Sequence, residues 1–120
     1  MGDFRKLLVW QKAKDLAIKI YKVTKNQLIS KDFGLRDQIQ RAAVSIPANI
    51  AEGDELDTDK QSVRHFYIAK GSAAELQTLL IISKEVGYID SITMEDMVNE
   101  CKIISAMLFK IIKARSEGRA

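Results

Sequence analysis

Apolar residues recur along this chain at helical spacing, most clearly between residues 34 and 53. Leu35, Ile39 and Ile46 follow one another at intervals of four and seven residues, which places them on one face of a helix. The other side of the same segment is also apolar, with Ala43 and Val44 among its residues. A helix that is apolar on both sides is buried on more than one side. The pattern therefore predicts a helix that the other segments cover.

Three further segments show the same period, and short polar connections separate them. The predicted helices span residues 9–26, 33–52, 59–86 and 93–114. Asp32, Thr58 and Thr93 are the expected N-caps, because their side-chain oxygens can accept the first free backbone amides of a helix. Gly53 and Gly87 are the expected helix ends. Four long helices without a convincing strand predict an all-α fold, an antiparallel up-down four-helix bundle in a single domain, 1–120.

Polar residues form stripes within these apolar segments and are expected to lie partly inside. Buried polar groups need hydrogen-bonding partners. We therefore predict an internal polar network made of Arg41, Ser45, Asn49, Glu52, Ser72 and Glu75. Glu75 is expected to be surrounded by apolar side chains. Because a buried carboxylate needs a neighbouring cation, we expect it to form an ion pair with Arg41.

The helices at 33–52 and 59–86 carry more apolar surface than one four-helix core can cover. Small residues such as Ala42, Ala48 and Ala73 permit close helix approach. Exposed apolar area of this kind usually marks an interface. The pattern therefore predicts a homo-oligomer.

The composition is that of an ordinary globular domain. The chain has 120 residues, of which 47% are hydrophobic and 29% charged, enough for a single core. Its apolar runs are far shorter than the ~20 residues of a membrane-spanning helix, and the first ten residues show no secretory signal. We expect a cytoplasmic protein without a membrane partner.

The inventory of reactive residues argues against an enzyme. Cys101 and His65 are the only residues of their kinds, so neither a zinc site nor a cysteine–histidine nucleophile is easily built. Cys101 is expected to be a buried packing residue and His65 a surface or interface residue. The acidic segment 54–59 is expected to form a loop, but it lacks the glycine and glutamate of a calcium loop and a phosphate-binding partner for magnesium chemistry. We predict no catalytic residues, no metal and no cofactor.

Basic residues slightly exceed acidic ones, 19 against 16, for a formal net charge of +3. This excess is compatible with nucleic acid but does not require it. The candidate phosphate contacts are Lys12, Lys19, Lys22, Arg36 and Arg64. The same residues also fit a solvated helix surface, and residue type alone does not separate the two interpretations.

The sequence contains the segments VWQKA at 9–13, QIQRAAVSIPANIAEG at 38–53 and FYIAKGSAAELQT at 66–78, followed by the pair Gly87–Tyr88. Together they resemble the four-helix bundle family named after the 23S rRNA intervening sequence. The resemblance implies a small bacterial protein that assembles as a barrel-like homopentamer. Some members are encoded within insertions in 23S ribosomal RNA genes. A similar accessory protein of diversity-generating retroelements binds nucleic acid and a reverse transcriptase.

The resemblance also bears on individual positions. The family's characteristic polar positions correspond to the six residues of the predicted network, which indicates an architectural role for them. One departure stands out: many relatives carry glycine and arginine after IAEG, whereas this chain has Asp54 and Glu55. If that segment lines the rim of an assembly, it would repel phosphate there.

Two functions fit these observations. The first is a non-enzymatic oligomeric scaffold that binds RNA or a ribonucleoprotein partner through basic side chains repeated around a ring. The alternative is a protein-only adaptor, in which the acidic segment recognises a basic protein and no nucleic acid is bound.

Overall fold

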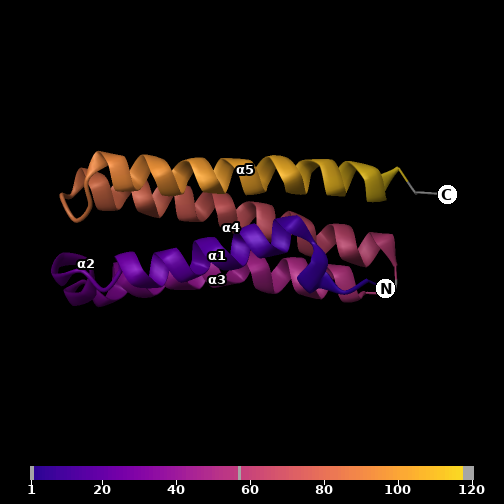
Figure 1. Ribbon diagram of the computed structural model, residues 1–120, viewed down its shortest axis with the longest axis horizontal. Helices are drawn as coiled ribbons and strands as arrows, with labels where there is room; N and C mark the ends of the chain where they lie inside the picture. Colours follow the sequence, from indigo (N-terminus) through magenta and orange to yellow (C-terminus); the bar gives the residue numbers. More distant parts are fainter. Residues whose placement is uncertain (1, 57, 118–120) are drawn as a thin grey trace.

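The computed structural model describes residues 2–56 and 58–117, and all regular structure within them is helical. Four long helices lie along one axis of a body measuring 50 × 21 × 18 Å (Figure 1). They are α1 (Leu8–Val23), α3 (Phe33–Glu55), α4 (Asp59–Glu85) and α5 (Ser91–Ser116). Two short helices, η1 (Phe4–Lys6) and α2 (Gln27–Lys31), complete the chain. The predicted all-helical bundle is confirmed.

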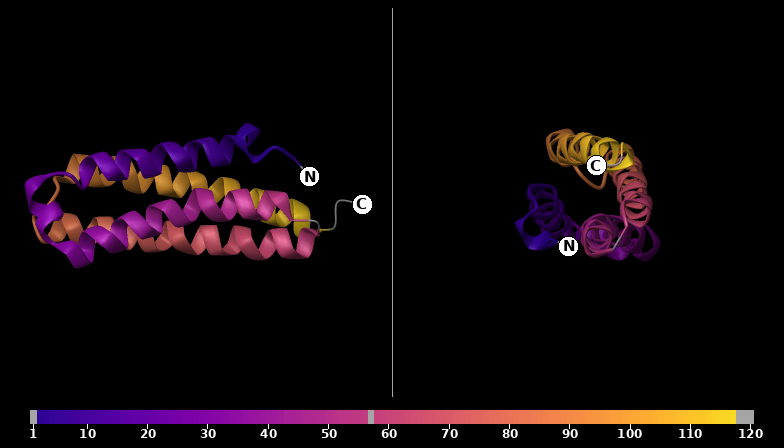
Figure 2. Two further views of the ribbon diagram at one scale, coloured as in Figure 1. Left: turned by 90° about the horizontal axis from the view of Figure 1, so that it is seen from below. Right: turned by 90° about the vertical axis from the view of Figure 1, so that its right-hand side faces the viewer.

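The long helices pack in the order of the chain. α1 lies against α3, α3 against α4 and α4 against α5, while α5 also contacts α1. α1 begins and α5 ends at one end of the bundle, and α2 lies at the other end (Figure 1). The end-on view in Figure 2 shows the four helices arranged around a common centre.

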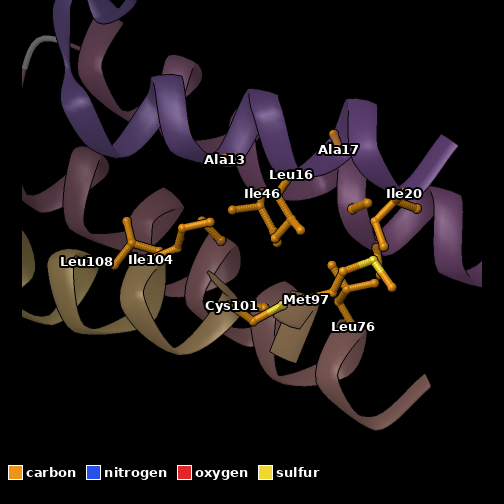
Figure 3. Close-up of a cluster of buried hydrophobic side chains, with 14 of the residues drawn as sticks. Ala13, Leu16, Ala17, Ile20, Ile46, Leu76, Met97, Cys101, Ile104 and Leu108 are labelled. Atoms are coloured by element: carbon orange, nitrogen blue, oxygen red, sulfur yellow. The ribbon is translucent and has the colours of Figure 1, made fainter. Parts of the chain in front are cut away.

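One stripe from each long helix forms the core. Figure 3 shows Leu16 and Ile20 of α1 near Ile46 of α3, Leu76 of α4 and Met97 of α5. All five side chains are 0% exposed. Burying an aliphatic side chain of this size contributes about 1.5–3 kcal/mol. The repeated apolar positions recognised in the sequence therefore supply the main stabilisation of the bundle.

The first predicted helix, 9–26, is shorter than expected. α1 ends at Val23, and a separate short helix, α2, follows. Asn26 causes this break, because its Oδ1 accepts the backbone N–H groups of Leu28 and Ile29, both at 2.9 Å. The helix α2 that follows buries Ile29, whereas a straight continuation of α1 would not be expected to bury it.

At three other helix ends, the capping residues recognised in the sequence predicted the boundary correctly. Asp32 and Thr58 are confirmed as N-caps, accepting the N–H groups of Leu35 and Gln61 at 3.2 Å. Gly87 is confirmed as the end of α4, with a positive φ of 84° that a residue with a Cβ adopts only at a cost.

Two further predicted boundaries are wrong. α5 begins earlier than expected, at Ser91, because Asp90 Oδ1 accepts the N–H of Thr93 at 2.7 Å. Thr93 is therefore inside the helix, where the N-cap was predicted. The second is the end of α3, which was expected at Gly53. The helix continues to Glu55, because Gly53 permits a close contact with α4 and does not end the helix.

Candidate functional site

Polar side chains join α3 to α4 along one side of the bundle. Ser72 Oγ donates a hydrogen bond to Ser45 Oγ at 2.8 Å, and Asn49 Nδ2 donates to the same oxygen at 3.0 Å. His65 Nδ1 lies 3.0 Å from Asn49 Oδ1 and 3.2 Å from Glu52 Oε2. Since both neighbours are acceptors, this geometry requires the imidazole proton on Nδ1. We call Ser45, Asn49, Glu52, His65 and Ser72 the polar seam.

Arg41 and Glu75, the other two members of the predicted network, are exposed and outside the seam. The expected ion pair between them is not formed within the described part of the chain. The prediction assumed that Glu75 is buried, but Ile68 and Ile82, one heptad away on either side, are 46% and 43% exposed. Water therefore solvates the carboxylate, and no desolvation forces it to find a cation.

Two lines of exposed side chains flank the polar seam. Ile68, Glu75 and Ile82 follow one another at intervals of seven residues and form one line along α4. Arg41 and Ala48, also seven residues apart, form a line along α3. We call these five residues the α3/α4 face. It combines apolar surface with one charge of each sign.

A buried ion pair connects the last turns of α3 and α5. Arg115 Nη2 lies 3.1 Å from Asp54 Oδ1, and the two side chains are only 16% and 5% exposed. The Arg115 guanidinium also lies over the Phe66 ring of α4, 4.9 Å from its centroid. One cation therefore contacts both α3 and α4 from α5, and in a low-dielectric environment such a contact is strong.

This pair corrects the prediction of an acidic loop at 54–59. Asp54 and Glu55 belong to α3, and Arg115 neutralises Asp54. Asp59 lies in the first turn of α4, where the helix dipole stabilises negative charge. Asp57 lies outside the described residues. The segment thus carries less free negative charge than its sequence indicates.

The sequence did contain a signal for the ion pair. Asp54 continues the four-residue spacing of the buried residues Ile46 and Ile50. Arg115 likewise follows Ile112 on the buried stripe of α5. A charged residue in register with the apolar stripe of each helix is the pattern of a buried pair.

The five basic candidates do not share one surface. Lys19 hydrogen bonds to Glu100 and Asp96 of α5, and the bond to Glu100 is the main cause of its raised pKa. Arg36 forms an ion pair with Asp37 at 3.0 Å. These two cations are already occupied within the chain.

The remaining three candidates are separated from one another. Lys12 lines a shallow depression with α5 residues, whereas Lys22 lines one with residues of α3. Arg64 is exposed on α4. None of the three forms an ion pair within residues 2–56 and 58–117, so their charges remain available to an external anion.

Cys101 is buried in the core, as predicted, beside Met97 and Leu76 (Figure 3). Burial raises the pKa of its thiol to about 12, so the reactive thiolate is scarce at neutral pH. Within the described residues, no group of three His, Cys, Asp or Glu side chains is arranged to hold a metal ion. No helix in that part of the chain is long and apolar enough to cross a bilayer.

The fold and the seam define a class: all-helical bundle proteins in which polar side chains link two of the long helices. The sequence profile of the family described as 23S rRNA-intervening sequence protein matches residues 5–110, and the chain belongs to this family. It is similar to a protein of unknown function from the S23 ribosomal protein family of Bacteroides thetaiotaomicron, whose crystal structure superposes with a TM-score of 0.82. The two sequences are 29% identical over 88% of this chain and 99% of the other. A comparison with curated proteins found no match.

Proposed function

We propose that this protein is a non-enzymatic scaffold that self-assembles and binds RNA or a ribonucleoprotein partner. The assembly is a ring of antiparallel up-down bundles in the cytoplasm, with the five copies that the family resemblance implies. The observation that carries the proposal is the α3/α4 face, where exposed isoleucines flank a carboxylate that has no ion-pair partner among the described residues.

A second copy of the chain fits this face. Contact would remove Ile68 and Ile82 from water, and Ala48 would allow the backbones to approach closely. If the α3 line of one copy meets the α4 line of the next, Arg41 can pair with Glu75 across the contact. A contact that joins the α3 line of one copy only to the α4 line of the next is heterologous, and repeated heterologous contacts generate a ring when the rotation between copies closes.

Charge and family membership support RNA as the ligand. The chain carries a net charge of +3, and Lys12, Lys22 and Arg64 have no ion-pair partner among the described residues. A ring repeats each weak phosphate contact, which raises the overall affinity. The neutralised Asp54 reduces the repulsion that its segment was expected to exert on phosphate. The resemblance to the nucleic-acid-binding accessory protein of diversity-generating retroelements points in the same direction.

The assembly is tested by reversing charges on the α3/α4 face. Arg41→Glu and Glu75→Arg each place like charges across the contact, which costs several kcal/mol. Each single variant is expected to be monomeric by multi-angle light scattering at micromolar concentration, while the wild type is oligomeric. The double variant restores opposite charges and should recover the wild-type mass. A monomeric wild type, or single variants that keep its mass, would contradict the proposed contact.

RNA binding is tested by titrating structured RNA at several salt concentrations. Binding through about six phosphate contacts should weaken roughly a thousandfold between 50 and 200 mM salt, because bound counterions are released. Fluorescence anisotropy with labelled RNA measures this dependence. If the oligomer binds no RNA even at 50 mM salt, the RNA function is wrong, and a protein-only adaptor is the remaining interpretation.

A further inference from the structure

We propose that the groove between α4 and α5 is a binding site for single-stranded nucleic acid. This inference rests on the proposed RNA function and specifies its surface and the form of the strand. None of the five basic residues selected from the sequence belongs to this groove.

The groove consists of two adjoining shallow depressions of about 470 and 430 Å³. Lys70 of α4 and Phe109 of α5 line both of them, which makes the surface continuous. The side chains that matter for binding are Tyr67, Lys70, Lys102, Phe109, Lys110 and Lys113. We call this surface the α4/α5 groove.

The charge of the groove favours a polyanion. Its four lysines form no ion pair with any described residue, and Glu117, at one end, is the acidic residue among the side chains that line the two depressions. Lys102 and Lys113 are separated by eleven helical residues, or ~16 Å at 1.5 Å per residue. The unpaired cations repel one another in the free protein, and a phosphate backbone running along the groove would relieve that repulsion.

The aromatic side chains favour a single strand over a duplex. Tyr67 and Phe109 line the same depression, and each is 58% exposed although its ring is apolar. Exposed aromatic rings beside lysines provide stacking surfaces for unpaired bases. In a duplex the base faces are already stacked on one another, so these rings would contribute little.

The groove between α1 and α3, on the opposite side of the bundle, provides a matched comparison. It also contains lysines and a tyrosine, with Tyr21, Lys22 and Lys25 among its lining residues. Its third lysine, Lys14, is already paired with Asp15 at 3.0 Å. With one aromatic side chain and fewer unpaired lysines, this groove is expected to bind a single strand more weakly.

The test uses a fluorescently labelled oligouridylate of about twelve nucleotides and a labelled RNA duplex, with binding measured by anisotropy. Tyr67→Ala and Phe109→Ala are each expected to weaken oligouridylate binding about tenfold and duplex binding less than about twofold. For four phosphate contacts the logarithm of the association constant falls with log salt at a slope of about −2.8, and Lys70→Ala with Lys110→Ala should reduce it to about −1.4. Far-UV circular dichroism checks that each variant is folded.

The control variant carries Tyr21→Ala and Lys25→Ala in the opposite groove and should keep most of the oligouridylate affinity. If the wild type binds oligouridylate and the aromatic variants bind it equally well, the inference is wrong while the proposed function stands. A wild type that binds structured RNA but not oligouridylate leads to the same conclusion. A wild type that binds neither overturns the proposed RNA function itself.

Discussion

Replacing Arg115 by alanine is expected to lower the free energy of unfolding by about 3 kcal/mol, the largest loss among the single substitutions that we predict. The variant leaves the Asp54 carboxylate buried without a cation, and removing one partner of a buried pair typically costs about 3–5 kcal/mol. The contact between the guanidinium and the Phe66 ring is lost as well. Asp54 Oδ2 already has no hydrogen-bond partner among the described residues, so these residues offer no ready replacement for Arg115. Urea unfolding followed by circular dichroism at a fixed protein concentration measures the effect.

An exposed arginine pair provides the control. Arg5→Ala breaks the ion pair with Asp3, in which the arginine side chain is largely solvated, and should change stability by less than about 0.5 kcal/mol. The double variant Asp54→Asn with Arg115→Met removes both charges and should recover at least half of the loss. If Arg115→Ala were as stable as Arg5→Ala, the buried pair would not be important for folding.

Replacing Gly53 by alanine is expected to destabilise the protein by about 1–3 kcal/mol through overpacking. A Cβ at this position would lie 2.8 Å from Phe66 Cε1 and 3.1 Å from the backbone oxygen of Ser62. The helices cannot simply separate, because Ser62 Oγ donates a hydrogen bond to the Gly53 carbonyl at 2.6 Å. Urea unfolding measures this loss in the same way.

Gly34→Ala is the matched control, since a Cβ there would meet nothing within 4 Å beyond its chain neighbours and the backbone of its own helix. Alanine is the better helix former, so this variant should be as stable as the wild type or slightly more stable. Combining Gly53→Ala with Phe66→Leu tests the steric cause. If the ring is the obstacle, the two effects should be less than additive by at least about 0.5 kcal/mol, whereas additive effects would argue against it.

Interactions between residues close in sequence could be predicted well. The N-caps at Asp32 and Thr58 and the helix end at Gly87 each depend on atoms within five residues. The four long helices likewise follow from apolar spacing along a single segment. Such features need no knowledge of the neighbouring helix.

Errors arose where the partner of a residue lies far away in the sequence. Gly53 looks like a helix end, and only its contact with Phe66 shows why a glycine is needed within α3. Asp54 looks like part of an acidic loop until Arg115, 61 residues later, is placed beside it. The predicted partners Arg41 and Glu75 lie on adjacent helices, yet both side chains are exposed to solvent.

The sequence by itself determined that this protein is an all-helical bundle with an apolar stripe on each long helix and to which family it belongs, because helical periodicity and a long sequence motif are properties of the chain alone. Only the tertiary structure decided which charges are neutralised and which remain available. That distinction depends on the distances between helices and on solvent exposure. In the folded protein Arg115 lies against Asp54 and Glu75 is exposed to water. Unpaired lysines lie beside Tyr67 and Phe109. Coulomb energies depend on separation and local dielectric, and neither is encoded in residue spacing along one helix.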